Sequence, residues 1–185
     1  MKTYIPIPRD KAYRLLNTGS LIVISSLDEN NNPNLAPIAW NCPVDYADTT
    51  RLLFVCSKEH KTYQNVTKTQ KFVILVPHAS QAKLVSMLGK ISGHEKNKIK
   101  ELQIEIEPSG NSGFAIPRDV IAYMECELYR EVDEGEVAVL FARVISAMAD
   151  REAFDKRLLS ETPAGKTLHH LGNKIFITTA NNIEI

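Results

Sequence analysis

The sequence predicts a mainly β fold with inserted helices, in which the strands form a largely antiparallel barrel. Continuous apolar runs of strand length occur at residues 52–56 and 72–76, and a later segment alternates apolar with polar residues. The order of strands and helices is also too irregular for a doubly wound parallel sheet. No internal repeat or long linker divides the chain, so a single domain spanning residues 1–185 is expected.

The first strands are expected at residues 21–24 and 34–41, joined by the polar turn 28–34. The second run contains Pro37, which cannot donate a ladder hydrogen bond, so it belongs at an edge or at a bulge. The runs at 52–56 and 72–76 have no polar alternation. Both are therefore expected to be buried on two faces.

Later strands alternate instead. From Ala122 to Leu128 every second residue is apolar, with Glu125 and Glu127 on the other face. A turn at Glu134 and Gly135 leads into residues 137–141, which predicts a hairpin. A last short strand is expected at 175–179.

Helices are expected between these strands. Four apolar residues have the i, i+3, i+4, i+7 spacing of one helix face, with Ser80 as a cap and Gly93 as the end. They are Leu84, Met87, Leu88 and Ile91. Further helices are expected to begin near Lys61, from Asp150 through Leu158, and from Asp10 through Leu16.

The charge balance argues against a general nucleic-acid surface. Of the 185 residues 22 are Lys or Arg and 22 are Asp or Glu, but residues 1–92 carry 11 basic and 6 acidic side chains. This local excess is compatible with an anion site in the first half. Two differently charged solvated faces would explain it equally well. With 44% hydrophobic and 24% charged residues, the composition is that of a globular protein.

Three cysteines, Cys42, Cys56 and Cys126, are widely spaced and form no Cys-x-x-Cys pair. They signal neither a zinc site nor a disulfide framework. Cys56 and Cys126 lie in apolar runs, which favours buried structural thiols. No apolar run approaches the roughly 18 residues of a membrane span, and no signal peptide is recognisable. A cytoplasmic protein with no membrane partner is expected.

Common catalytic motifs are missing: there is no G-x-G-x-x-G, P-loop, H-E-x-x-H or G-x-S-x-G sequence. His169 and His170 are adjacent, so they point in different directions and make a poor metal pair. No metal site is predicted.

Residues 56–65 are the most informative segment, because they leave a buried strand and enter a helix near Lys61. The first N–H groups of a helix lack internal partners and favour an anion. Hydroxyls of Ser57 and Thr62, with the cations Lys58 and Lys61, would complete a phosphate cradle, and His60 could add a donor. Basic residues on an ordinary surface loop are the alternative interpretation.

Residues 34–44 form the second candidate segment, which contains Pro37 and the single tryptophan, Trp40. A proline-interrupted edge strand leaves backbone groups free to face a planar heteroaromatic ring. The alternative is that Trp40 anchors the core beside an ordinary bulge.

Read in order, several segments carry a family resemblance. They are Asp28 with 33–40, 57–66, 71–77, 89–93, 124–127 and 168–172. Together they resemble the flavin reductase-like family, which includes the flavoredoxins. The resemblance implies an antiparallel Greek-key split β-barrel that binds FMN and works as a homodimer, with the flavin near the subunit interface.

The resemblance also assigns residues by position. The isoalloxazine ring would be lined by Ile38, Ala39, Trp40 and Asn41. Cys56 and Ser57 would approach the ribityl chain, and the phosphate would be held by Lys58, His60, Lys61 and Thr62. Ser92 and Gly93 match a loop that closes over the flavin. His170, beside the ring, is the candidate catalytic residue, as a hydrogen-bond donor or gate.

Two positions depart from the family pattern. Ala39 stands where many relatives have Ser, so a hydroxyl bond to the flavin is absent. His60 stands where relatives often have Arg, which implies a phosphate affinity that depends on pH.

The resemblance implies a flavin reductase that uses NADH or NADPH and passes electrons through FMN to a small-molecule or protein acceptor. An electron carrier and a non-catalytic FMN-binding module are the alternatives. The flavin would supply the chemistry, which agrees with the missing catalytic motifs.

Overall fold

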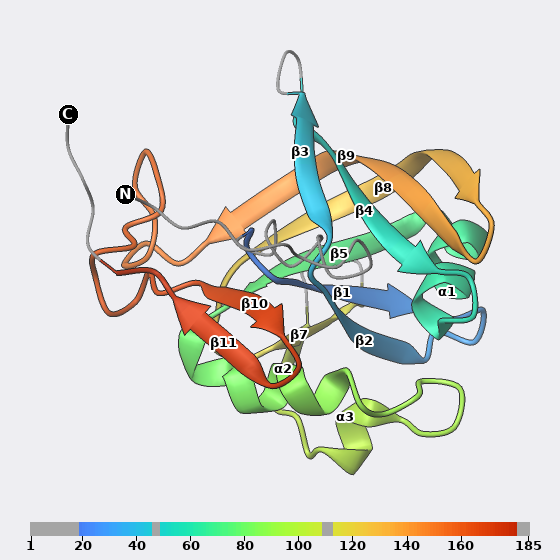
Figure 1. Ribbon diagram of the computed structural model, residues 1–185, viewed down its shortest axis with the longest axis horizontal. Coiled ribbons are helices and arrows are strands. Elements are labelled where there is room, and N and C mark those ends of the chain that lie inside the picture. The colour runs from blue at the N-terminus through green and yellow to red at the C-terminus, as the bar shows by residue number, and fades with distance from the viewer. Residues whose placement is uncertain (1–18, 46–48, 109–112, 181–185) are drawn as a thin grey trace, which may run out of the picture.

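Seven strands form one antiparallel sheet in the computed structural model, which describes residues 19–45, 49–108 and 113–180 (Figure 1). Their order across the sheet is β2-β1-β5-β8-β9-β4-β3. The strands are β1 (Ile22–Leu27), β2 (Pro33–Ile38), β3 (Asn41–Asp45), β4 (Arg51–Ser57), β5 (Lys71–Pro77), β8 (Val120–Glu134) and β9 (Val137–Ala149).

The two outermost strands of the sheet, β2 and β3, are consecutive in the chain, so the two edges of the sheet meet where the chain passes between them. Only Ala39 and Trp40 separate β2 from β3, and the Val55 N–H of β4 donates to the Trp40 carbonyl at 3.0 Å. The chain thus passes directly from the partner of β1 to the partner of β4. The antiparallel barrel is confirmed, and so is the edge position of the Pro37 strand.

The smaller elements decorate this barrel. The helices are α1 (Lys61–Thr69), the 3-10 turn η2 (Ala79–Gln81), α2 (Ala82–Leu88) and α3 (Lys98–Glu101). Two short hairpins pair β6 (Ile106–Pro108) with β7 (Ala115–Pro117), and β10 (Leu168–Gly172) with β11 (Ile175–Thr178). No helix in the described ranges is long and apolar enough to span a bilayer.

Two apolar clusters share the sheet. The first fills the barrel with side chains such as Phe54 and Phe72, whose rings meet edge to face at 5.5 Å. The second joins the opposite faces of β1 and β5 to Val85 and Leu88 of α2. Because β5 takes part in both clusters, residues 72–75 are all buried, as expected.

β4 does not behave like β5. Leu52, Phe54 and Cys56 are buried, whereas Leu53 and Val55 are only half-buried. The expectation that β4 is buried on two faces is therefore wrong. The reason is that the cluster beneath α2 receives side chains from β1 and β5 and none from β4.

The β8–β9 hairpin is confirmed and is longer than predicted, and β11 confirms the last strand. Gly135 in the hairpin turn has a φ of 77°, a conformation that favours glycine.

The helix boundaries need correction. The turn leading into α2 is capped by His78, whose ring accepts the Ser80 N–H, rather than by Ser80. α2 ends at Leu88 with Gly89 as its cap, so Gly93 does not end it.

Asp150 starts a turn and not a helix. Its carbonyl accepts the N–H groups of Ala153 and Phe154, after which Phe154 pairs with Leu158 in an isolated bridge. Phe154 is exposed, so this segment lacks the buried stripe that would stabilise a helix. The helix expected from Asp10 lies outside the described residues.

Candidate functional site

A pocket of about 300 Å³ opens beside the first turn of α1. Its walls come from β2, the start of α1, the segment 88–94 and Lys98. Five of the residues singled out in the sequence line it together. They are His60, Lys61, Thr62, Ser92 and Gly93.

The start of α1 leaves its N–H groups available at this pocket. After β4 the chain turns, with the His60 N–H donating to the Ser57 carbonyl at 3.1 Å, and the helix begins at Lys61. The N-cap residue His60 is extended and provides no side-chain cap. An uncapped first turn carries partial positive charge, so it favours an anion at this point.

Asn34 of β2 joins the pocket wall to α1. Its Nδ2 donates to the Thr62 hydroxyl at 3.0 Å, and both side chains are buried. The Asn34 Oδ1 is buried without a hydrogen-bond partner. A buried, unpaired polar atom at a pocket is a feature expected where a ligand completes the bonding.

Residues 88–94, the closing segment, form a further wall of the pocket. His94 Nε2 donates to the Glu59 carbonyl at 3.0 Å. A Cβ at position 93 would overlap Asn34 Oδ1 and lie 3.4 Å from the Lys61 Cβ. Glycine is therefore required by the close approach of this segment to β2 and α1.

Lys61 is held by an acidic turn residue. Its Nζ lies 3.2 Å from Asp28 Oδ2, while Asp28 Oδ1 accepts the N–H groups of Asn30 and Asn32. The backbone N–H of Asn32, helped by its side chain and by Lys61, lowers the Asp28 pKa to about 2. Asp28 thus both caps the β1–β2 turn and orients Lys61.

Lys58 points to a different part of the molecule. Its ammonium pairs with Asp133 of the β8–β9 hairpin, and its N–H donates to the Glu136 carbonyl at 3.0 Å. Lys58 does not line the pocket. Ser57 also stays outside, where its hydroxyl accepts the Glu59 N–H at 3.4 Å.

A second pocket of about 340 Å³ adjoins the first, since both are lined by Pro37, Gly89 and Lys90. Ala39 and His170 lie here with apolar neighbours. The His170 ring lies 5.1 Å from the Phe176 ring, and its Nε2 donates to the Asn173 carbonyl at 3.1 Å. The two pockets together have one polar end and one largely apolar end.

The other predicted residues lie outside both pockets. Ile38 is buried in the barrel core, and Trp40 is half exposed. Asn41 Nδ2 donates to the Ser20 carbonyl at 2.9 Å. Cys56 is buried, which raises the pKa of its thiol to about 11 and makes it a poor nucleophile.

His169 and His170 diverge as expected. His169 Nε2 lies 3.0 Å from the Thr167 hydroxyl, while His170 lies in the second pocket. The described residues contain no group of three or more His, Cys, Asp or Glu side chains that could hold a metal ion.

Asn34 and Lys98 are among the pocket residues that no sequence pattern marks as ligand-binding. Asn34 lies in the candidate strand, but no pattern marks its contact with Thr62. Lys98 is one of three alternating lysines, at 96, 98 and 100, and only its burial distinguishes it from the other two.

Asp28→Asn should lower the free energy of unfolding at pH 7 by about 1–2 kcal/mol. Because the folded pKa lies below the ordinary value of 3.8, the carboxylate stabilises the fold above about pH 4. This stabilisation is lost as pH falls through about 2. Urea unfolding at pH 7 and at about pH 2 should therefore show a difference in the free energy of unfolding between wild type and variant that is smaller in acid. A difference that stays constant would contradict this role of Asp28.

Comparisons with known proteins agree with this architecture. The chain matches the flavin reductase like domain over residues 13–168. It is 30% identical to the uncharacterized protein YddH of Escherichia coli, over 99% of this chain and 98% of that protein.

Two solved structures are similar across the whole chain. The FMN-binding domain of a flavin reductases-like enzyme from Shewanella baltica is 25% identical, with a TM-score of 0.82 over 97% of this chain and 95% of that one. Flavoredoxin of Desulfovibrio vulgaris shares the fold at 14% identity, with a TM-score of 0.82 over 100% and 97% of the two chains. The resemblance read from the sequence is confirmed, and the chain belongs to the flavin reductase-like domain family.

Proposed function

We propose that this chain is an FMN-binding oxidoreductase, and specifically an NAD(P)H-dependent flavin reductase that passes electrons through bound FMN. The observation that carries the proposal is the pair of adjoining pockets. One lies at the uncapped start of α1, and the other is largely apolar. A phosphate at one end and an aromatic ring at the other match these two environments.

The residues present fit FMN. The first-turn N–H groups of α1, with Lys61 and Thr62, would hold the phosphate. The unpaired Asn34 Oδ1 offers an acceptor to a ligand hydroxyl, and Gly93 lets residues 88–94 approach β2 and α1 closely beside it. Pro37 and the apolar side chains of the second pocket would pack against the ring.

Bound FMN would supply the redox chemistry, accepting hydride from a nicotinamide and passing electrons on. The chain's own contribution is to bind and orient. His170, fixed by Asn173 and Phe176, can hold a proton at its ring at the edge of the second pocket. The buried Cys56 and Cys126 take no part, because burial raises their thiol pKa to about 11 and about 12.

The visible spectrum of the purified protein tests the proposal. Bound FMN should give the yellow absorption of an oxidised flavin, which anaerobic NADH or NADPH should bleach. If the protein binds FMN but neither NADH nor NADPH bleaches it, the proposed reductase activity is wrong. Reduction by dithionite followed by transfer to an acceptor would then indicate an electron carrier, and no transfer a binding module. A protein that binds no FMN at micromolar flavin would contradict all three.

Lys61→Gln should weaken FMN binding about tenfold, since it removes a charge-assisted contact at the pocket. Lys58→Gln should change the affinity less than twofold, because Lys58 faces Asp133 and does not line the pocket. Titration of FMN fluorescence measures both. The resemblance alone predicts that both lysines hold phosphate, so equal losses would favour it over the geometry.

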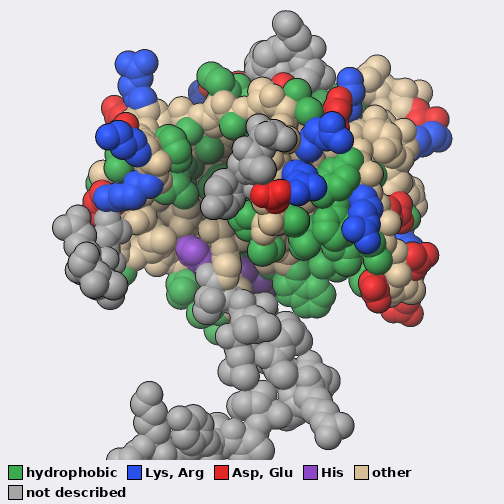
Figure 2. Space-filling model, turned by 90° about the horizontal axis from the view of Figure 1, so that it is seen from above, with side chains coloured by type: hydrophobic (Ala, Val, Ile, Leu, Met, Phe, Trp, Pro, Cys, Tyr) green, Lys and Arg blue, Asp and Glu red, His purple; other side chains and the backbone are tan. Residues whose placement is uncertain are grey.

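We also propose that the chain works as a homodimer and delivers electrons to a small-molecule or protein acceptor. Figure 2 shows hydrophobic side chains gathered among Lys and Arg on the face that is uppermost in Figure 1, over β3, β4, β8 and β9. Val44, Ile145 and Met148 on these strands are 45%, 54% and 58% exposed. A patch of this kind is typical of an interface.

Light scattering tests the homodimer. The wild-type mass should be twice that of the chain at micromolar concentration, and Ile145→Glu should lower it toward one chain. Lys83→Glu puts the same acidic side chain at an exposed position of α2, outside these strands, and as the control it should leave the mass unchanged. A wild-type monomer at these concentrations would contradict the homodimer.

A further inference from the structure

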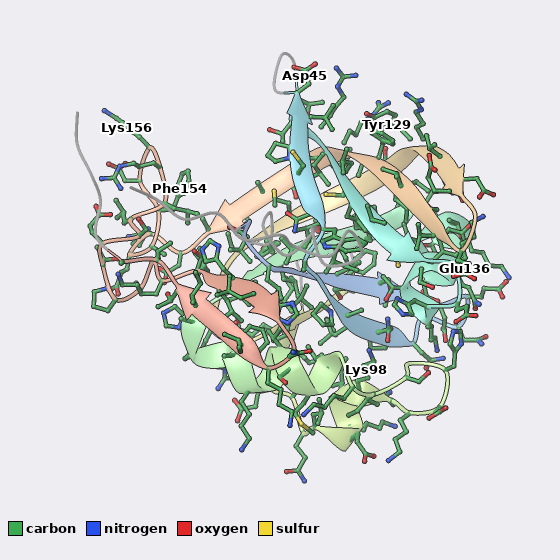
Figure 3. The ribbon with its side chains drawn as sticks, viewed as in Figure 1. Asp45, Lys98, Tyr129, Glu136, Phe154 and Lys156 are labelled. Atoms are coloured by element: carbon green, nitrogen blue, oxygen red, sulfur yellow. The ribbon has the colours of Figure 1, made fainter. Side chains whose placement is uncertain are left out.

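Lys98 is a buried cation in the wall of the first pocket. It begins α3, and its side chain lies between α3 and β2 (Figure 3). The residue is only 6% exposed. Lysine is rarely buried to this extent unless its charge has a partner.

The ammonium of Lys98 ties together two elements that shape the pocket. Its Nζ donates at 2.9 Å to the Leu35 carbonyl of the edge strand β2, and at 2.9 Å to the Leu88 carbonyl. Leu88 is the last residue of α2, where unpaired carbonyls favour a cation. These bonds hold the start of segment 88–94 against β2.

Two carbonyls do not neutralise the charge. An ammonium has three donors, of which these bonds use two. None of the ion pairs between described residues includes Lys98. Burial, the single cause of the shift, lowers its pKa to about 8. An anion in the pocket would offset this desolvation.

We propose that Lys98 is a binding residue for the phosphate of the flavin mononucleotide, its ammonium supplying positive charge to the pocket while its two carbonyl bonds position the closing segment. This inference rests on the proposed function. Lys98 lines the same pocket as Lys61, Thr62 and Gly93, but it belongs to α3 and not to α1. The phosphate would thus have cationic groups from α1 and from α3.

The proposal implies that FMN binding is coupled to protonation of Lys98. A bound phosphate favours the charged amine, so the pKa of Lys98 should be higher in the FMN complex than in the free protein. The affinity for FMN should then be constant below about pH 8 and should fall at higher pH, by about tenfold between pH 7 and pH 9. Riboflavin, which has no phosphate, should show no such fall.

Other groups around the pocket also titrate or carry charge. Those that line it are Glu59, His60, Lys61, Lys90 and His94. On α3 itself, Lys96 pairs with Glu101, and Lys100 is exposed. Variants at position 98 alone are needed to separate Lys98 from these groups.

The test is titration of FMN and of riboflavin at pH 7, 8 and 9 with wild type, Lys98→Met and Lys98→Arg. Lys98→Met should bind FMN at least tenfold more weakly at pH 7, and its affinity should not change with pH. Lys98→Arg keeps its charge and should also lose the pH dependence. Lys100→Met, on the same helix, should behave as wild type. Thermal unfolding of each variant reports whether the fold is retained.

The outcomes separate the inference from the function on which it rests. If Lys98→Met weakens FMN and riboflavin equally, Lys98 only positions the segment, and the phosphate role is wrong. If the fall in FMN affinity at high pH persists in Lys98→Arg, another group titrates, and the inference is also wrong. A wild-type protein that binds no FMN at any pH overturns the proposed function itself.

Discussion

Phe54→Ala is expected to lower the free energy of unfolding by about 3–5 kcal/mol, the range for removing a fully buried aromatic side chain. Phe54 has no exposed surface and lies in the middle of β4, between Asn41 of β3 and Leu140 of β9. Its ring packs edge to face on Phe72 of β5 at 5.5 Å. The side chain therefore joins strands from opposite parts of the barrel wall, and no neighbour can fill its volume without moving a strand.

Urea unfolding followed by circular dichroism measures the loss, provided that the slope with denaturant stays that of wild type. The matched control is Leu53→Ala, the adjacent residue, which is half-buried on the outer face of β4. It should cost about 1 kcal/mol, because the half-buried Leu53 side chain buries less apolar surface on folding than Phe54 does. Equal losses for the two variants would show that the inside and outside of β4 are assigned wrongly.

The contrast between β4 and β5 shows what the sequence could predict of this fold. Both runs are apolar and of strand length, and both strands were predicted correctly. Local pattern does not reveal whether a second layer covers a strand. α2 packs over β1 and β5, and β4 sends no side chain into that layer. The two strands differ only through tertiary packing.

The same limit applies to the site. Residues 60–62 are neighbours at a helix start, so a local pattern places them together. Lys58 belongs to the same segment, but it turns away because the distant β8–β9 hairpin presents Asp133. Lys98 carries no local signal at all. Its burial depends on two carbonyls, from β2 and from α2, that only the folded chain brings to it.

The residues from Ile38 to Asn41 do not all line the two adjoining pockets. Neighbouring side chains in extended backbone point to opposite sides. Ile38 thus enters the barrel core, whereas Ala39 lines the second pocket. The resemblance implies that all four residues line the ring, whereas Ile38, Trp40 and Asn41 lie outside both pockets.

Gly93→Ala should weaken FMN binding about 30-fold, corresponding to about 2 kcal/mol, within the usual cost of overpacking a closely packed position. The added Cβ would overlap Asn34 Oδ1. The Asn34 side chain is buried and held by its bond to Thr62, so relief requires breaking that bond or moving the closing segment. Either movement changes the pocket at the first turn of α1. Gly19→Ala, where a Cβ meets nothing within 4 Å, is the matched control and should bind FMN as wild type does.

A double-mutant cycle with Asn34→Ala identifies the cause of that loss. If the methyl group acts by displacing the Asn34 amide, truncating Asn34 leaves room for it. The affinity losses of Gly93→Ala and Asn34→Ala should then be less than additive, with a coupling of at least about 1 kcal/mol. Strict additivity would mean that position 93 acts on the flavin without Asn34. The close approach between β2 and the closing segment would then not be what shapes the pocket, and the loss would have to arise from the methyl group meeting the ligand directly.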